Sequence, residues 1–409
     1  MKLTKSERNW VLYDVGNSAY ILLFTTIIPI MFNSLAKDHL EDATYLAYWG
    51  YAVTVSTILT ALIGPSLGAI ADKLSLRKRF FIIFMALGAL GCFLFPFTNS
   101  WMVFLILVVV SKLGFNGSLV FYDSMLIDIT SEDRMDNVSS LGYAYGYIGS
   151  VIPFIISILL SVKHDALGIS MDLAMKLVFT INALWWIIFT LPLLKVYKQK
   201  YVRTEKDLEK THLLQTFQKI KGDKKVYMFL FSFLFYIDGV YTIISMATAY
   251  GTSLGLSSNG LVLALLVTQL VAFPCAIYFG KISKKYETGF LIKICIFAYL
   301  LISIYAIFLN NIVQFWILAI TVGMFQGAIQ ALSRSYYAKI IPKENSGEYF
   351  GIYDVFGKGA AIIGTLTVSL VTQLTGNQHV SISTLSIMFL IGILLFFKTD
   401  KLKGNNEIK

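Results

Sequence analysis

The chain has 409 residues, of which 56% are hydrophobic and only 14% are charged, and its mean hydropathy is +0.70. This composition excludes an ordinary soluble globular protein, which carries about a quarter of its residues charged. The formal net charge is +10, but the basic residues are spread over short loops and tails, which argues against a nucleic-acid partner. Anionic lipid headgroups are the natural partner for basic segments of this kind.

Apolar stretches long enough to cross a bilayer recur along the whole chain. They predict an all-α membrane protein with twelve transmembrane helices. We place these spans at 9–33, 46–71, 79–97, 101–127, 139–162, 173–195, 226–250, 257–280, 288–309, 312–336, 347–374 and 379–397. The start of the chain resembles the basic region of a signal peptide. The first span, however, carries Asp14 and Asn17 and lacks a convincing cleavage site, so we expect it to be retained.

The basic residues also predict an orientation. Most of the 34 Lys and Arg residues fall in segments that lie on the cytoplasmic side if both termini are cytoplasmic. Lys and Arg are enriched in cytoplasmic loops, so the asymmetry predicts cytoplasmic termini. Three basic residues lie inside predicted spans instead, namely Lys112, Lys293 and Lys358.

A long basic segment at 197–225 divides the predicted spans into six and six. The expected organisation is an N-terminal six-helix bundle at 1–196, a cytoplasmic linker at 197–225, a C-terminal six-helix bundle at 226–398 and a cytoplasmic tail at 399–409. Pro65 and Pro274 lie late in the second span of each half, and Gly142 and Gly351 lie early in the fifth. Two parallel six-helix repeats describe the major facilitator architecture, which leaves a site between the halves near the bilayer midplane.

The loop after the second span contains a glycine, an aspartate four residues on, and then a basic cluster. It reads Gly68-Ala-Ile-Ala-Asp72-Lys and then Arg77-Lys-Arg79, and it resembles the signature of major facilitator proteins at this place, with Ser75 where a glycine is common. By this resemblance Asp72 would lock a gate by docking at the N-terminus of the eleventh helix, where the helix dipole favours an anion. The alternative is that the loop only anchors the chain at the headgroups.

Polar residues at helical spacing occupy one face of the first, fourth, seventh and tenth spans. A carboxylate in the hydrocarbon core normally faces a partner or a watery cavity, and these four helices line the central cavity of major facilitator proteins. The candidate pathway residues, including one from the eleventh span, are Asp14, Asn17, Lys112, Asn116, Asp123, Asp238, Tyr241, Gln326, Gln330 and Lys358.

The charged candidates differ in depth. Asp238 lies close to the midplane, whereas Asp14 lies nearer one end and could be a gate or a solvated residue. Lys358 is about as deep as Asp238, which predicts an ion pair between them, either fixing helix packing or taking part in coupling. Lys112 could pair with an acid or bind a substrate carboxylate. A buried carboxyl group without a partner favours its protonated form, which suits a proton carrier, and sodium coupling fits the same residues.

The neutral candidates also have two interpretations. Gln326 and Gln330 could hydrogen-bond between helices or contact a substrate. Asn116 lies between Phe115 and Gly117 and could merely support a kink.

Several motifs along almost the whole chain point together to one family. They include Tyr13-Asp-Val-Gly-Asn-Ser-Ala-Tyr20, Tyr236-Ile-Asp-Gly-Val-Tyr-Thr242, Gln326-Gly-Ala-Ile-Gln-Ala-Leu-Ser-Arg-Ser335 and Gly347-Glu-Tyr-Phe-Gly351. With these motifs the chain resembles the autophagy-linked vacuolar amino-acid effluxers of fungi and their bacterial relatives, a branch of the major facilitator superfamily. It departs from them at Asp123, where relatives tend to carry a neutral amide, and at the charged Lys112.

The resemblance implies efflux of amino acids or similar small metabolites. It also implies that Arg334 serves as a gate or binds an anion, with an interfacial anchor as the alternative. The compact length and short loops look more like the bacterial relatives, which favours a cell membrane over a vacuole.

Other functional classes fit the sequence less well. A Gly-rich phosphate loop is absent from the sequence, and the four histidines show no metal or triad spacing, so we expect no enzyme, no metal site and no cofactor. The prediction is a secondary active transporter of small organic solutes, working as a monomer by alternating access with proton-coupled efflux. A lipid or lysolipid flippase of the same fold, which would want a large apolar cavity, and a non-transporting receptor are the alternatives.

Overall fold

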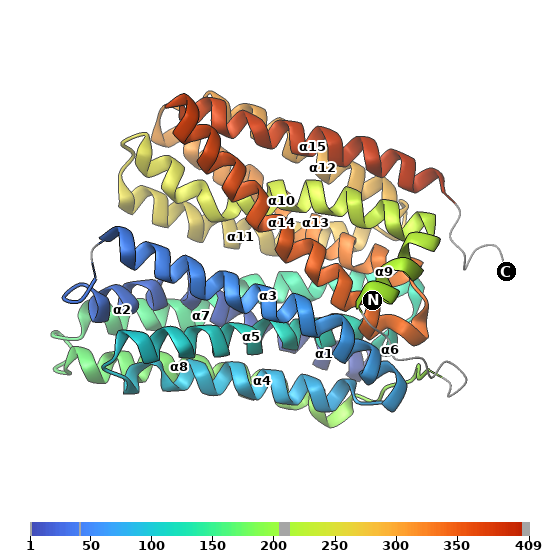
Figure 1. Ribbon diagram of the computed structural model, residues 1–409, viewed down its shortest axis with the longest axis horizontal. Coiled ribbons are helices and arrows are strands. Elements are labelled where there is room, and N and C mark those ends of the chain that lie inside the picture. The colour runs from blue at the N-terminus through green and yellow to red at the C-terminus, as the bar shows by residue number, and fades with distance from the viewer. Residues whose placement is uncertain (1, 41, 204–212, 403–409) are drawn as a thin grey trace.

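The computed structural model describes residues 2–40, 42–203 and 213–402, and all regular secondary structure in these ranges is helical. Parts of the expected linker, 204–212, and of the expected tail, 403–409, lie outside the described residues. The twelve predicted spans are confirmed as twelve helical segments long and apolar enough to cross a membrane, running side by side (Figure 1). The chain is therefore an all-α multi-pass membrane protein.

The N-terminal half contains the first six spans. Its elements are α1 (Lys5–Thr25), α2 (Ile27–Ala36), α3 (Asp42–Leu74), α4 (Arg77–Leu94), η1 (Phe95–Phe97), α5 (Trp101–Ser124), α6 (Leu126–Ile129), η2 (Glu132–Arg134), α7 (Met135–Lys163) and α8 (Met171–Val196). The first span is longer than its apolar stretch because Thr4 and Glu7 form a capping box that starts α1. It is also interrupted at Thr26, shortly before Pro29, whose ring clashes with the carbonyl four residues earlier.

The C-terminal half repeats this order after a short helix in the expected linker. Its elements are α9 (Leu213–Gly222), α10 (Lys224–Ser253), α11 (Ser258–Ile282), α12 (Thr288–Ile307), α13 (Ile312–Ile340), η4 (Lys343–Asn345), α14 (Ser346–Thr375) and α15 (Gln378–Lys401). The expected linker thus includes helical structure, and the last helix continues past the expected boundary at 398.

The duplication is visible in the element bounds. Trp101 opens α5 and Ile312 opens α13, while Glu132 opens η2 and Lys343 opens η4, a constant shift of 211 residues. Figure 1 shows the N-terminal half, in blue to green, beside the C-terminal half, in yellow to red. The two halves are therefore six-helix bundles of the same architecture.

The start of α1 and the end of α15 lie at one end of the bundle, together with the basic loops at 73–79 and 281–285 (Figure 1). We call this the basic end and the opposite one the far end. The halves touch mainly through α3 against α14 and α7 against α11.

Glycines allow the close approach between the halves. A Cβ atom on Gly68 would overlap the backbone carbonyl of Gly347 at the start of α14. A Cβ atom on Gly351 would come within 2.6 Å of the Pro65 backbone. Any larger residue at these positions would push α3 and α14 apart.

We predict that Gly68→Ala lowers the thermal stability of the purified protein, because the added methyl group meets rigid backbone and overpacking of this kind costs about 1–3 kcal/mol. Gly50→Ala in the same helix is the matched control, since a Cβ atom there meets nothing within 4 Å. Thermal unfolding of the two variants measures the difference. Equal midpoints for Gly68→Ala and Gly50→Ala would contradict the close contact.

Candidate functional site

Arg334 of α13 is the centre of a buried ion cluster that joins the two halves. Its guanidinium lies 2.9 Å from the Asp123 carboxylate of α5 and 3.6 Å from the Asp14 carboxylate of α1. Arg334 is 2% exposed. Removing one member of a buried ion group typically costs about 3–5 kcal/mol, because it leaves an uncompensated charge. We call Asp14, Asp123 and Arg334 the charge cluster.

Neighbouring groups fix the guanidinium in place. Its Nε donates to the Ser139 hydroxyl (2.9 Å) and its Nη2 donates to the Ser139 carbonyl (3.1 Å). Its central carbon lies 4.7 Å from the Trp10 ring centroid and 4.5 Å from that of Tyr143. Such stacking of a cation on aromatic rings is itself attractive. The N-terminal half therefore supplies a socket of aromatic rings and hydrogen-bond acceptors for a residue of the C-terminal half.

Asp14 is likewise buried and bound by neighbouring side chains. The Tyr122 hydroxyl donates to Asp14 Oδ2 (2.7 Å), and Asn17 Nδ2 donates to Oδ1 (3.4 Å). A Cβ atom on Gly142 would collide with the Asp14 carboxylate, which explains the glycine there. Asp14 is buried, so its interpretation as a solvated residue is wrong. The interfacial-anchor interpretation of Arg334 is wrong for the same reason.

The charge cluster follows the internal duplication. Asp123 and Arg334 are 211 residues apart, so they occupy equivalent positions in the two halves. Glu132 and Lys343 are related in the same way and lie 3.8 Å apart. The repeats thus bring opposite charges together at positions that correspond.

Asp72 makes the contact that its motif predicts. Its two carboxylate oxygens each accept a backbone N–H, from Gly347 and from Glu348, at 2.9 Å. These groups open α14, the eleventh span, so the helix dipole also favours the anion. Ser75 has a left-handed φ of 55°, which explains why glycine is common at that position.

Arg77 ties this contact to the N-terminal half. Its guanidinium lies 2.7 Å from Asp72 and 2.8 Å from Asp128, and all three side chains are fully buried. The alternative of a loop that only anchors the chain at the headgroups does not fit this burial.

Residues 197–203, the described start of the expected linker, contact Asp128 of the N-terminal half and Glu348 of the C-terminal half. The Tyr197 hydroxyl and the Lys200 N–H donate to Asp128 at 2.6 and 2.9 Å. Burial, together with the negative charge of Asp128, raises the pKa of Tyr197 well above 10. Arg203 lies 3.3 Å from Glu348, at the N-terminus of α14. This segment is therefore a packed strap across the basic end rather than a solvated loop.

Besides the charge cluster and the docking of Asp72 on α14, a further polar contact at the basic end joins the halves. Asp136 of α7 accepts hydrogen bonds from Ser335 (2.6 Å), Thr288 (2.7 Å) and Lys339 (2.7 Å) of the C-terminal half. The sequence interpretation missed Asp128, Asp136 and Glu348, because acids at span ends are usually solvated.

Deeper in the bundle, the predicted Lys358–Asp238 ion pair is wrong. Lys358 Nζ lies 2.5 Å from Asp354, one turn earlier in α14, and 3.4 Å from the Asn116 carbonyl across the two halves. Asp238 instead accepts the Gly364 N–H (2.9 Å) and the Thr242 hydroxyl (3.4 Å). Gly364 and Lys358 are six residues apart, so they face directions roughly 120° apart on α14. The i, i+4 spacing of Asp354 and Lys358 is the signal that could have found this pair.

The remaining candidates lie around the middle of the bundle. Gln330 Nε2 donates to the Tyr147 hydroxyl of α7 (3.2 Å), another contact between the halves. Lys112 Nζ lies over the Phe24 ring, 4.1 Å from its centroid. Tyr241 is half-buried on α10.

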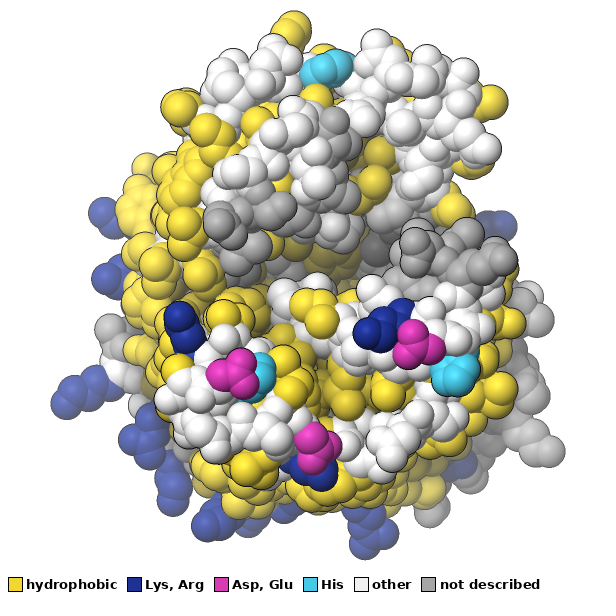
Figure 2. Space-filling view, turned by 90° about the vertical axis from the view of Figure 1, so that its left-hand side faces the viewer, with side chains coloured by type: hydrophobic (Ala, Val, Ile, Leu, Met, Phe, Trp, Pro, Cys, Tyr) yellow, Lys and Arg dark blue, Asp and Glu magenta, His cyan; other side chains and the backbone are white. Residues whose placement is uncertain are grey.

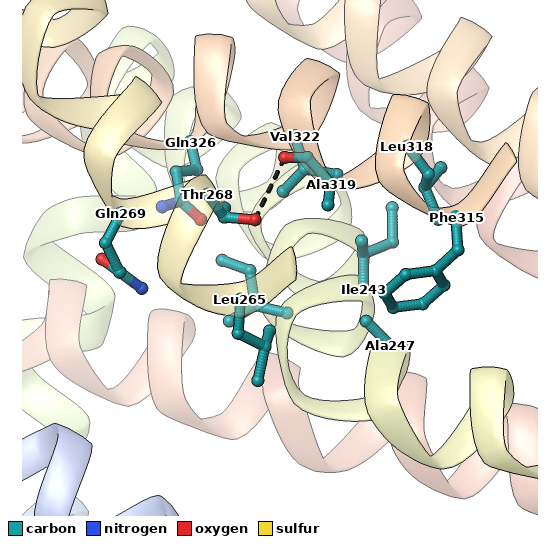
Figure 3. Close-up of a pocket in the computed structure, with 11 residues that line it drawn as sticks. Ile243, Ala247, Leu265, Thr268, Gln269, Phe315, Leu318, Ala319, Val322 and Gln326 are labelled. Atoms are coloured by element: carbon teal, nitrogen blue, oxygen red, sulfur yellow. Dashed lines mark hydrogen bonds between the residues drawn. The ribbon is translucent and has the colours of Figure 1, made fainter. Parts of the chain in front are cut away.

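Gln326 is almost fully buried and lines a pocket between α10, α11 and α13 (Figure 3). The pocket is mostly apolar, with side chains such as Leu265, Phe315 and Leu318, and with the Thr268 hydroxyl donating to the Ala319 carbonyl at 3.1 Å. Among the described residues, no group of three His, Cys, Asp or Glu side chains could hold a metal ion.

The two ends of the bundle differ. The polar contacts between the halves in the described part of the chain run from the basic end to about the middle, where Asn116 and Lys358 meet. Figure 2 shows the far end, where the surface is hollowed between the halves. The basic end is thus closed, and a hollow enters from the far end.

This fold and this arrangement define a membrane transporter of the major facilitator type. The structure is similar to that of FucP, a major facilitator transporter solved in the outward conformation, with a TM-score of 0.76 and 12% identity over 96% of this chain and 98% of that chain. It is also similar to an outward-facing bacterial homologue of the iron transporter ferroportin, with a TM-score of 0.74 and 13% identity over 97% and 99% of the two chains.

The chain belongs to the family described as vacuole effluxer Atg22 like, which matches residues 41–134 and 128–409. It is 41% identical to YxiO of Bacillus subtilis (strain 168), a transporter of major facilitator type, over 96% of this chain and 94% of that protein. Autophagy-related protein 22 of Kluyveromyces lactis is 22% identical over 88% of this chain and 80% of its own length. The family match and the Bacillus subtilis relative confirm the family inferred from the motifs, and both are named for transport rather than for an enzyme activity.

We predict that Arg334→Met opens the basic end, because Asp14 and Asp123 then face each other without a cation. A cysteine at Ser140, which is fully buried beside Gly280 of α11, reports the opening through its rate of thiol labelling in a variant without the native cysteines. We expect labelling to be about tenfold faster or more, which corresponds to about 1.4 kcal/mol or more.

Lys343→Met is the matched control, since the Glu132–Lys343 pair is exposed and such pairs contribute only about 0–1 kcal/mol. A labelling rate in Arg334→Met equal to that in the control would contradict a role of the charge cluster in closing the basic end.

Proposed function

We propose that the chain is a secondary active transporter that exports amino acids or related small metabolites by alternating access, coupled to protons. The observation that carries this proposal is the charge cluster, which joins the halves at the closed end while the opposite face is hollowed. Alternating access requires contacts between the halves that can break and re-form, and an ion cluster shared between them is such a contact.

The gating residues of this proposal are Gly68, Asp72, Arg77 and Arg334. Opening of the basic end would separate α14 from Asp72 and withdraw Arg334 from its socket. Arg77 would keep Asp72 paired while α14 is away, since both residues belong to the N-terminal half. The cost of an unpaired buried carboxylate would thereby be reduced.

The distribution of basic residues supports a membrane orientation with cytoplasmic termini. The basic end then faces the cytoplasm, and the hollow opens outside the cell. The compact length favours the plasma membrane of a bacterium, and the family description as an effluxer supports export. Anionic lipid headgroups would contact the basic loops, and one chain contains both halves, so a monomer suffices.

Asp238 is the proposed proton carrier. It is 3% exposed, and its described partners are an N–H and a hydroxyl group rather than a cation. When a carboxyl group is bound by neutral donors, its protonation does not leave a buried cation without a partner. Asn17, Asn116, Tyr241, Gln326 and Gln330 complete the proposed pathway, together with Lys112, Lys358 and the charge cluster.

We predict that Asp238→Asn abolishes amino-acid accumulation driven by a pH gradient in liposomes, while counterflow exchange without a gradient persists. An amide cannot carry the proton but preserves the shape of the side chain. The control is Asp172→Asn, because Asp172 is exposed and pairs with Lys176 at the surface. Radiolabelled uptake with and without the gradient measures both activities.

Several outcomes would contradict the proposal. Accumulation by Asp238→Asn that equals the control would exclude Asp238 as the carrier, and a dependence on sodium alone would replace the proton. Movement of fluorescent lysolipids without amino-acid or small-peptide exchange would indicate a flippase. An absence of all exchange would indicate a non-transporting role.

A further inference from the structure

Lys112 of α5 belongs to the proposed pathway and lies among aromatic rings. Its Nζ lies 4.1 Å from the Phe24 ring centroid and 5.1 Å from that of Phe115. No carboxylate within ion-pair distance is recorded for it among the residues that the structure describes. Aromatic faces attract a cation, but less strongly than an anion does at close range.

The acids on the two helices of this seam already have partners. Asp354 lies 2.5 Å from Lys358, and Asp123 lies 2.9 Å from Arg334. The charged groups that act on Lys112 are Lys358, which repels it, and Asp354. This part of the seam between the halves thus holds a cation that lacks an anion of its own.

A second unpaired donor lies one turn further along the same helix face. Asn116 is 1% exposed, and its Nδ2 has no hydrogen-bond partner, whereas its backbone carbonyl accepts from Lys358 of the other half (3.4 Å). A buried donor without a partner is destabilising, so its presence here points to a ligand that would accept its hydrogen bond. Lys112 and Asn116 thus place an ammonium group and an amide N–H donor one turn apart on the same helix.

The depth of this site suits a transported solute. Lys112 is eleven residues from the start of α5 at the far end, roughly 17 Å at helical rise and so about halfway across the hydrocarbon core. The contact between Asn116 and Lys358 places the site at the seam of α5 and α14, one helix from each half. Substrate sites of this architecture lie at such a seam near the midplane.

We propose that Lys112 and Asn116 form a subsite for the carboxylate of the transported solute. This inference rests on the proposed function and assigns one of its contacts. A carboxylate offers acceptors to both donors and neutralises Lys112. The subsite adjoins Lys358 of the other half, so a bound carboxylate would add a negative charge between Lys112 and Lys358. Alternating access must open the seam at which these two lysines lie.

Two variants test the subsite in liposome counterflow with the twenty standard amino acids, each competed by its carboxamide. Lys112→Met should raise the KM for the amino acids about tenfold or more, the value of one lost charge-assisted hydrogen bond. It should also abolish the preference for the acid over the amide. Lys293→Met is the matched control, because Lys293 is a span lysine with its own acid, Asp400, at 2.6 Å.

A binding readout separates this proposal from the proposed function. Amino acids, but not their carboxamides, should raise the unfolding temperature of the detergent-purified wild type and of Lys293→Met, and not that of Lys112→Met. Asn116→Ala should weaken the same shift without abolishing it.

Exchange by the wild type with an unchanged KM in Lys112→Met, or equal competition by acids and amides, would overturn the subsite alone. If the wild type exchanges no amino acid, the proposed function fails. A thermal shift lost in Lys112→Met would then still support the subsite, and an absent shift would overturn it.

Discussion

The structure depends on one buried cation that the C-terminal half places inside the N-terminal half. Arg334 is almost fully buried, and its anions, Asp14 and Asp123, both come from the other half. Neither half can bury its charges alone without a cost of several kcal/mol, so the halves must stay together at this point or admit water to it. The aromatic socket and Gly142 make this burial possible. The glycine leaves room for the Asp14 carboxylate, and the rings exclude solvent from the charges.

In the proposed cycle the other contacts between the halves would have to separate. Among the described residues, the Asp72 side chain contacts α14 through two backbone N–H groups, and Arg77 would keep the carboxylate paired if they separated. The close approach of Gly68 and Gly347 buries little side-chain surface, so separating the helices exposes little apolar area. The described strap crosses the same place and contacts both halves through Asp128 and Glu348. Several of the described contacts that close the basic end are therefore between charged or polar groups, and in the proposed cycle a transported charge would alter them.

The sequence predicted the twelve spans, the two halves and the docking of Asp72, because hydropathy, repeated Pro and Gly positions and a local motif carry that information. It did not predict which charges would pair. Arg334 meets residues from α1 and α5, and helical spacing fixes faces without fixing which helices those faces meet. The Lys358–Asp238 error came from depth alone, whereas the i, i+4 acid Asp354 was nearer in sequence. The break at Thr26 was missed because a hydropathy window ignores proline chemistry.

The most direct test of the central claim measures the far end while the charge cluster is changed. Spin labels at Asp38 and Ser257, in far-end loops of the two halves, report the width of the hollow by electron–electron double resonance in liposomes. If the charge cluster holds the basic end closed, neutralising both acids as Asp14→Asn with Asp123→Asn should shift the distance distribution to shorter values, because the bundle rocks about its middle. A distribution identical to that of the labelled wild type would contradict the account.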